Sequence, residues 1–132
     1  MALVHHDLCF GCGQTNLFGL LLELARVDDD RVAGRCFIKQ DHQGPDRKFA
    51  HQGVIAAALC EAMALACGPD ARALRMGVEW SSDAPVGAFL DVEASTERST
   101  QGTIDANATA SSEGSPVASA TATFDRGRTP SV

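Results

Sequence analysis

Apolar and polar residues alternate in the second half of the chain, most regularly in its last two apolar segments. One side of this alternation holds Ile104 and three alanines in the first of these segments, and three alanines with Phe124 in the second. A period of two is typical of a half-buried β-strand. Small inward residues of this kind leave room for a helix close to the sheet. With turn residues between them, four antiparallel strands are predicted, over residues 71–82, 87–99, 103–111 and 116–125.

Two more strands are predicted nearer the N-terminus. Periodicity alone leaves residues 17–26 open between helix and strand, but Gly19 near the start and the acidic turn at residues 28–30 favour a strand. Residues 31–39 alternate between apolar and basic positions, as a strand does. We therefore expect the two segments to form a hairpin.

Residues 53–67 are predicted to form the central helix. They are rich in Ala, Leu and Met, carry one charged group, Glu61, and end at Gly68 and Pro69. A helix that is apolar on every face must be buried on every face. Either the sheet curls around it, or a second subunit covers what remains, or both. The loop before it, residues 40–52, is long enough to indicate a functional or mobile segment.

Composition indicates a single globular domain of 132 residues, with residues 1–16 as a polar lead-in and residues 125–132 as a polar tail. The net charge of −6, with scattered basic residues, argues against nucleic acid or an anionic membrane as a partner. No apolar run reaches the roughly 18 residues that cross a bilayer, and we expect no signal peptide. The five cysteines are expected to be reduced thiols of a cytoplasmic protein.

Short motifs follow one another between residues 9 and 124. They are Cys9-Phe10-Gly11-Cys12-Gly13 with Asn16 and Gly19-Leu20, then His42-Gln43-Gly44, His51-Gln52-Gly53, Pro85 with Gly87, and the closing strand that ends at Phe124. In this order and spacing they resemble the hot-dog fold acyl-CoA thioesterases of the PaaI type. The motif at residues 51–53 stands where that family usually has His-Gly-Gly.

The resemblance implies an α+β hot-dog fold, in which a curved antiparallel sheet wraps one long buried central helix. It also implies a homodimer or homotetramer (a dimer of dimers) that binds an acyl-CoA or similar thioester at the subunit interface, with no cofactor. In the family a backbone N–H at the helix start polarises the thioester carbonyl, and here that group belongs to Gly53. A helix N-terminus suits the oxyanion that develops there. The family's catalytic carboxylate position falls on Cys60, next to Glu61.

Glu61 is the first candidate for a catalytic group, because a carboxylate in an apolar helix is costly unless it is paired or faces a wet cleft. It is either a general base or nucleophile, or a carboxylate that pairs with Arg72, Arg75 or a backbone amide of the sheet, or one that faces solvent at the edge of the helix. Cys60 is either a thiol nucleophile with a nearby histidine as base, or a small buried residue, and the second interpretation is favoured.

The loop before the helix supplies further candidates. His51 either orients the substrate or caps the helix. Gln43 either hydrogen-bonds the thioester oxygen or a water molecule, or is an exposed loop amide. Gln52 and His42 are substrate-binding candidates beside them. The arginines that suit the phosphates of coenzyme A are Arg72, Arg75, Arg98, Arg126 and Arg128.

A zinc site is a further possibility near the N-terminus, because zinc binds neutral imidazole and thiolate. The candidate ligands are His5, His6, Cys9 and Cys12. The pattern lacks a second, distant pair of ligands, and the resemblance accounts for Cys-x-x-Cys without a metal. We therefore expect no metal at these residues, with zinc as the open alternative.

The sequence thus favours an acyl-CoA thioesterase that hydrolyses a small or medium acyl-thioester. One alternative is a hot-dog protein that binds acyl-CoA or another hydrophobic small molecule without turning it over, because Cys60 occupies the carboxylate position. Another is a dehydratase or lyase of a biosynthetic pathway, with His51 and Glu61 as its acid–base pair.

Overall fold

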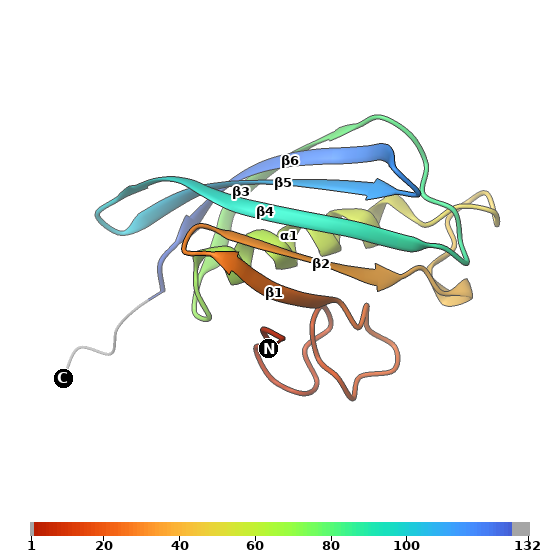
Figure 1. Ribbon diagram of the computed structural model, residues 1–132, viewed down its shortest axis with the longest axis horizontal. Helices are drawn as coiled ribbons and strands as arrows, with labels where there is room; N and C mark the ends of the chain where they lie inside the picture. The colour runs from red at the N-terminus through yellow and green to blue at the C-terminus, as the bar shows by residue number, and fades with distance from the viewer. Residues whose placement is uncertain (1, 128–132) are drawn as a thin grey trace.

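The computed structural model describes residues 2–127, which form one six-stranded sheet and one long helix (Figure 1). Helix α1 spans Gln52–Cys67, and a short 3-10 helix, η1, spans Gln40–His42. Neighbouring strands are antiparallel throughout. In their order across the sheet, the strands are β1 (Glu23–Asp28), β2 (Arg31–Phe37), β4 (Phe89–Thr100), β5 (Thr103–Ser112), β6 (Ser115–Asp125) and β3 (Arg72–Trp80).

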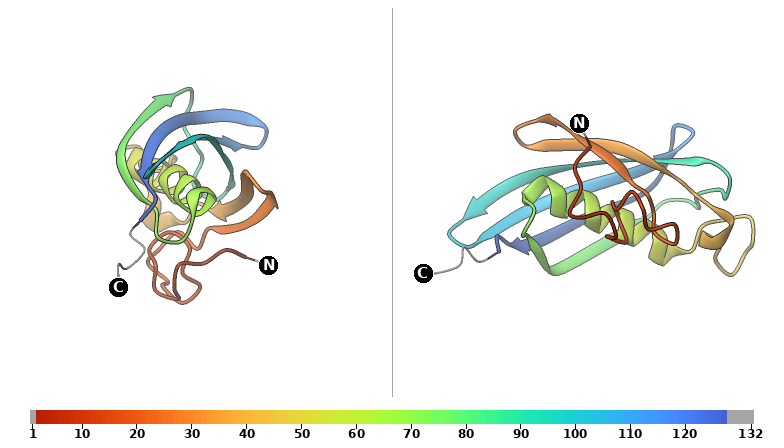
Figure 2. Two further views of the ribbon diagram at one scale, coloured as in Figure 1. Left: turned by 90° about the vertical axis from the view of Figure 1, so that its left-hand side faces the viewer. Right: turned by 90° about the horizontal axis from the view of Figure 1, so that it is seen from below.

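The sheet curls around α1, which lies against its concave side (Figure 2). The inward positions that the alternation predicts on β4, β5 and β6 are all buried. They are Leu90, Val92 and Ala94, then Ile104, Ala106, Ala108 and Ala110, then Ala118, Ala120, Ala122 and Phe124. Because most of these side chains are a single methyl group, the helix packs close to the strands. The predicted architecture of a curved sheet around one central helix is confirmed.

The ends of α1 follow from its flanking residues. His51 precedes the helix with extended backbone, and its side chain accepts a hydrogen bond from the N–H of Gly53. Gly68 ends the helix with φ of 140°, a conformation that favours glycine, and its N–H donates to the carbonyl of Ala64. Within the described residues, α1 included, no helix has both the length and the apolarity to cross a membrane.

Residues 2–22, here called the N-terminal segment, pass across the side of α1 that the sheet leaves open (Figure 2). Cys12, Leu20 and Leu22 are buried in the same core as the helix. The N–H groups of Leu20 and Leu22 donate to the carbonyls of Phe10 and Gly11, at 2.7 and 2.9 Å. Since these residues bond within the N-terminal segment, β1 begins only at Glu23, later than the predicted strand over residues 17–26.

The predicted loop between β2 and α1 is folded back on itself. Gln43 pairs with Ala50, and Phe49 pairs with Pro85 in isolated bridges. The N–H of Ala50 also donates to the carbonyl of Ala84 at 2.8 Å. These bonds hold the loop to itself and to residues 84–85, so the residues before the helix have defined positions.

The close packing of helix and sheet predicts that a larger side chain is not tolerated at the inward alanines. Replacing the buried Ala108 by leucine is expected to reduce the free energy of unfolding by about 1–3 kcal/mol, since the added methyl groups have no free volume. Its neighbour Thr109 points outward and is exposed, so Thr109→Leu is the matched control, with an expected change below about 0.5 kcal/mol. Urea denaturation of both variants checks this, and equal effects would contradict the inward packing.

Candidate functional site

The start of α1 presents backbone N–H groups at the protein surface. The N–H of Gly53 donates to Nδ1 of His51 at 2.8 Å, and the N–H of Val54 donates to the His51 carbonyl at 3.0 Å. Both His51 and Gly53 are exposed. The N–H expected to meet a substrate carbonyl therefore lies at the protein surface, where it is already hydrogen-bonded to the His51 side chain.

The folded loop brings two further sequence candidates to this place. The N–H of His51 donates to the carbonyl of His42 at 2.7 Å. A Cβ built on Gly44 would lie 3.0 Å from Cα of His51, so the loop backbone runs directly beside the helix start. Gln43, adjacent to both, is exposed and its amide donates to the carbonyl of Gln40 at 2.9 Å. The structure thus brings His42, Gln43, His51, Gln52 and Gly53 together.

His42 has a structural position within this group. Its side chain is only 4% exposed, and its Nδ1 accepts a hydrogen bond from the N–H of Lys39 at 3.2 Å. Nε2 is buried and has no hydrogen-bond partner within the described residues. Burial, followed by the charge of Lys39, lowers the pKa of His42, while Asp41 and the Gly19 carbonyl oppose that shift. His42 is therefore held as a neutral imidazole that orders the loop.

Cys60 and Glu61 are not part of this group. They lie two turns further along α1, and Glu61 is about 12 Å from Gly53 along the helix axis. Burial, and secondly the charge of Glu61, raises the pKa of the Cys60 thiol. Because the thiolate is the nucleophile, Cys60 is poorly suited to attack a substrate.

The carboxylate of Glu61 instead lies among side chains of the N-terminal segment. Its Oε2 is 2.9 Å from Nδ1 of His5 and 3.4 Å from Sγ of Cys9. Sγ of Cys12 is 3.4 Å from the same His5 nitrogen. His5, Cys9, Cys12 and Glu61 thus form a compact set of groups that are ligands for metal ions in proteins. His6 is outside it, and its Nδ1 accepts a hydrogen bond from the N–H of Leu8.

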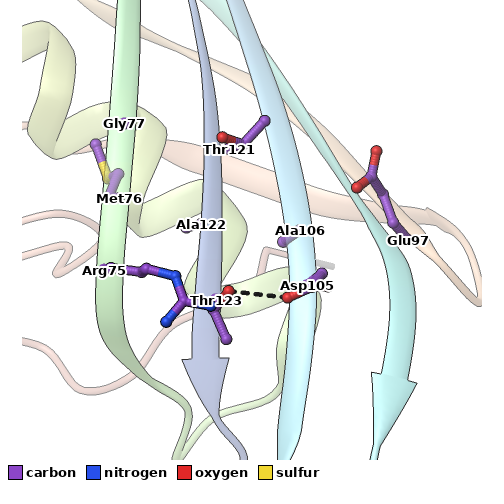
Figure 3. A pocket seen from close by; sticks show the side chains of 9 residues that line it. All are labelled: Arg75, Met76, Gly77, Glu97, Asp105, Ala106, Thr121, Ala122 and Thr123. Atoms are coloured by element: carbon purple, nitrogen blue, oxygen red, sulfur yellow. Dashed lines mark hydrogen bonds between the residues drawn. The ribbon is translucent and has the colours of Figure 1, made fainter.

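The arginine candidates Arg72 and Arg75 do not belong to this cluster. Arg72 and Arg75 are exposed on β3, which begins shortly after α1 ends. Arg75 lines a shallow hollow on the outer face of the sheet, where Thr123 donates a hydrogen bond to Asp105 at 2.9 Å (Figure 3). Within one protomer, neither arginine joins the group at the helix start. Arg128 lies outside the described residues.

Sequence reasoning missed the proximity of Glu61 to the N-terminal segment. The separation in sequence between Glu61 and the two cysteines is about 50 residues, and no spacing rule connects them. One signal was available, since a single charged residue in an apolar helix requires a polar partner. The sequence did not indicate which of several polar segments supplies that partner.

Comparisons with known proteins identify the fold. No protein-family model and no curated protein matches the chain. The phenylacetic acid degradation-related protein of Ralstonia eutropha has a similar structure, with a TM-score of 0.73 and 21% identity over 80% of this chain and 85% of that one. The PaaI protein of Escherichia coli, from the phenylacetic acid degradation operon, gives 0.73 and 14% over 80% and 83%. A Streptococcus mutans protein bound to acetyl CoA gives 0.72 and 17% over 79% and 86%.

These likenesses, all at low sequence identity, show that the chain has the hot-dog fold. The fold expected from the motifs is confirmed. The correspondence between Cys60 and the family's carboxylate position stays a prediction, as do the roles of the site residues.

The lowered pKa of His42 predicts a loss of stability in mild acid. Between the ordinary histidine value of about 6.5 and the lower value in the folded protein, the unfolded chain binds more protons, so the free energy of unfolding falls as the pH falls. His42→Asn keeps an acceptor for the Lys39 N–H but does not titrate. Urea denaturation at about pH 7.5 and 5.5 is expected to show a smaller loss in this variant than in the original protein. Equal losses would contradict the assignment.

Proposed function

We propose that this protein hydrolyses acyl-CoA thioesters at the start of α1. The observation that carries the proposal is the exposed N–H of Gly53, whose acceptor is the side chain of His51 at 2.8 Å. A helix start offers N–H groups and a partial positive charge, which stabilise the negative oxygen that forms when a thioester carbonyl is attacked. The acetyl CoA bound by the Streptococcus mutans protein of the same fold supports this class of substrate.

In the proposed reaction, the thioester carbonyl oxygen replaces Nδ1 of His51 as the acceptor for the Gly53 N–H. The freed imidazole removes a proton from a water molecule as that water attacks the carbonyl carbon. The tetrahedral intermediate then breaks its C–S bond, and the imidazolium gives the proton to the departing coenzyme A thiolate. The exposed amides of Gln43 and Gln52, beside His51, are proposed to orient the substrate.

This assignment gives the role of base to His51 rather than to Glu61. The Glu61 carboxylate is engaged by His5 at 2.9 Å, and its distance of about 12 Å along the helix puts it beyond hydrogen-bond reach of a carbonyl held by Gly53. The raised pKa of Cys60 keeps that thiol protonated, so it is given no catalytic step either. His42, buried in the loop, acts as a positioning residue for His51.

We also propose that two chains pair through β3. This strand lies at an edge of the sheet and is exposed along most of its length. An exposed edge with unpaired backbone groups readily adds another strand. Two exposed apolar side chains on it, Leu74 and Trp80, would be covered by the pairing. Arg72 and Arg75, on the same strand, would then lie at the seam, where we propose that they meet the phosphates of coenzyme A.

A second candidate function is binding of an acyl-CoA without hydrolysis. It is favoured by the engagement of both candidate groups, since His51 caps the helix and Glu61 is held by the N-terminal segment. In that case the helix start binds the carbonyl, but no group activates water.

A pair of substitutions at Gly53 separates the role of its N–H from the effect of added bulk. Gly53→Ala keeps the N–H, whereas Gly53→Pro removes it at the first turn of a helix, where proline is tolerated. We expect Gly53→Pro to lower kcat/KM by about 100-fold or more, and Gly53→Ala to change it much less. The assay is release of free coenzyme A thiol from a panel of short, aryl and long acyl-CoA thioesters, with circular dichroism as the check on folding.

Equal activity of Gly53→Pro and Gly53→Ala would rule out the N–H as the oxyanion donor. Saturable binding of an acyl-CoA without thiol release, across the whole panel, would support the second candidate function instead. Conversion of the acyl group to another product, detected by mass, would point to a dehydratase or lyase.

The proposed seam predicts a dimer or a dimer of dimers in solution. Small-angle scattering should give at least twice the mass of one chain. The double substitution Leu74→Arg and Trp80→Arg is expected to dissociate the assembly, because it places like charges opposite one another across the paired strands. Phe18→Arg, at an exposed aromatic residue of the N-terminal segment, is the matched control and should leave the mass unchanged. A monomer at all concentrations for the original protein would contradict the pairing.

A further inference from the structure

The cluster that holds Glu61 has no role in the proposed reaction, yet its groups converge closely. Four side chains each place one ligand atom within 4.8 Å of the others: the imidazole of His5, the thiols of Cys9 and Cys12, and the carboxylate of Glu61. It is shielded from solvent, since Cys12 is fully buried and the side chains of His5 and Glu61 are 19% and 14% exposed. The four groups come from two distant parts of the chain and contact one another.

Four of the distances between these atoms are close to those of a tetrahedral metal site. Zinc bonds of usual length at tetrahedral angles separate nitrogen from sulfur by about 3.6 Å, and nitrogen from oxygen by about 3.4 Å. In the structure Nδ1 of His5 is 3.6 Å from Sγ of Cys9 and 3.4 Å from Sγ of Cys12. Oε2 of Glu61 is 3.4 Å from Sγ of Cys9 and 2.9 Å from Nδ1 of His5. These four distances differ from the tetrahedral values by no more than about half an ångström.

The backbone around the cluster is built to bring these atoms together. The N–H of Gly13 donates to the carbonyl of Cys9 at 2.9 Å, which turns the two cysteines toward one point. A Cβ on Gly13 would lie 2.4 Å from the carbonyl oxygen of Asp7, so a larger residue does not fit there. The N–H of His5 donates to Sγ of Cys12 at 3.1 Å, which fixes the position of this sulfur.

Glu61 reaches the cluster because residue 11 is a glycine and has no side chain in its way. A Cβ built on Gly11 would lie 2.4 Å from Cδ of Glu61 and 2.7 Å from its Oε1. Only glycine at this position lets the carboxylate approach the turn between the cysteines. The helix therefore supplies the fourth ligand that the pattern of His5, Cys9 and Cys12 lacks in the sequence.

We propose that His5, Cys9, Cys12 and Glu61 bind one zinc ion, which fastens the N-terminal segment to the middle of α1. Thiolate, imidazole and carboxylate ligands in a tetrahedral set favour zinc over the harder divalent cations. Four protein ligands leave no position for substrate, so the ion is structural. The proposal does not depend on the proposed hydrolysis, because the cluster is about 12 Å along the helix from Gly53.

The test begins with metal analysis of the full chain, purified under reducing conditions. The expected content is about one zinc per chain. Titration of the reduced, metal-free protein with Co²⁺ should give the intense visible bands of a tetrahedral site together with thiolate-to-cobalt absorption. Removal of zinc by a strong chelator should lower the thermal midpoint of unfolding, since the ion binds the folded state preferentially.

Two matched pairs of variants locate the ligands. His5→Ala is expected to weaken Co²⁺ binding by about 100-fold or more, while His6→Ala, at the adjacent exposed histidine, should not change it. Cys9→Ser should weaken binding similarly, whereas Cys67→Ser, at a half-buried thiol near the end of α1, should not. Glu61→Gln tests the fourth ligand and should lower affinity without abolishing the thiolate absorption.

Less than about a tenth of an equivalent of metal in the folded, reduced protein, without cobalt bands on titration, would overturn the proposal. Equal losses in His5→Ala and His6→Ala would also overturn it. Activity toward acyl-CoA is a separate readout, so failure of the hydrolysis proposal leaves these results interpretable.

Discussion

Helix α1 is apolar on nearly every face, and the rest of the structure depends on covering it. The curved sheet covers most of its circumference, through inward residues of β4, β5 and β6 that are close to fully buried. The N-terminal segment passes over another side and contributes Cys12, Leu20 and Leu22 to the same core. A sheet alone would leave that side exposed to water, at a cost of roughly 25 cal/mol for each Å² of apolar surface. Residues 2–22 are therefore part of the domain and not a tail.

The one charge in α1 gives that cover a defined position. Apolar contacts are not directional, so hydrophobic packing alone holds a loop against a helix without fixing its register. Glu61 provides polar contacts of fixed geometry with His5 and Cys9. Gly11 allows the carboxylate to approach, and Gly13 allows the turn between the cysteines to close. In this structure a carboxylate that sequence reasoning assigned to catalysis has its nearest partners in the N-terminal segment.

Most of the fold was predictable because it follows from local periodicity. The alternation around Ile104 and Phe124 identified inward positions, and Gly68 with Pro69 marked the end of the helix. The strand over residues 17–26 was predicted to begin too early in the chain, because the leucines there are compatible with either a strand or an apolar loop. Their actual bonds, from Leu20 to Phe10 and from Leu22 to Gly11, depend on the tertiary path of the N-terminal segment. The periodicity of apolar residues in the sequence carries no information about that tertiary path.

The candidate site was predictable only in part, for a related reason. His42, Gln43, His51 and Gly53 are near one another in sequence, and the structure keeps them together. The contact between Glu61 and the cysteines joins residues about 50 positions apart, and the hydrogen bond from Gly53 to His51 depends on a side-chain rotamer. Both facts are three-dimensional, and both change which group is suited to act as a base.

The alanines that face α1 from β5 and β6 also limit where a hydrocarbon tail can be accommodated. With Ala106 and Ala108 each only 1% exposed, the layer between helix and strands is filled, and a tail has no entry into the interior of one protomer. If two chains pair as proposed, the outer surfaces of both protomers would set the length of tail that can bind. Because a twofold axis repeats every residue, one substitution at that boundary would change the tail-binding surface at two symmetric places.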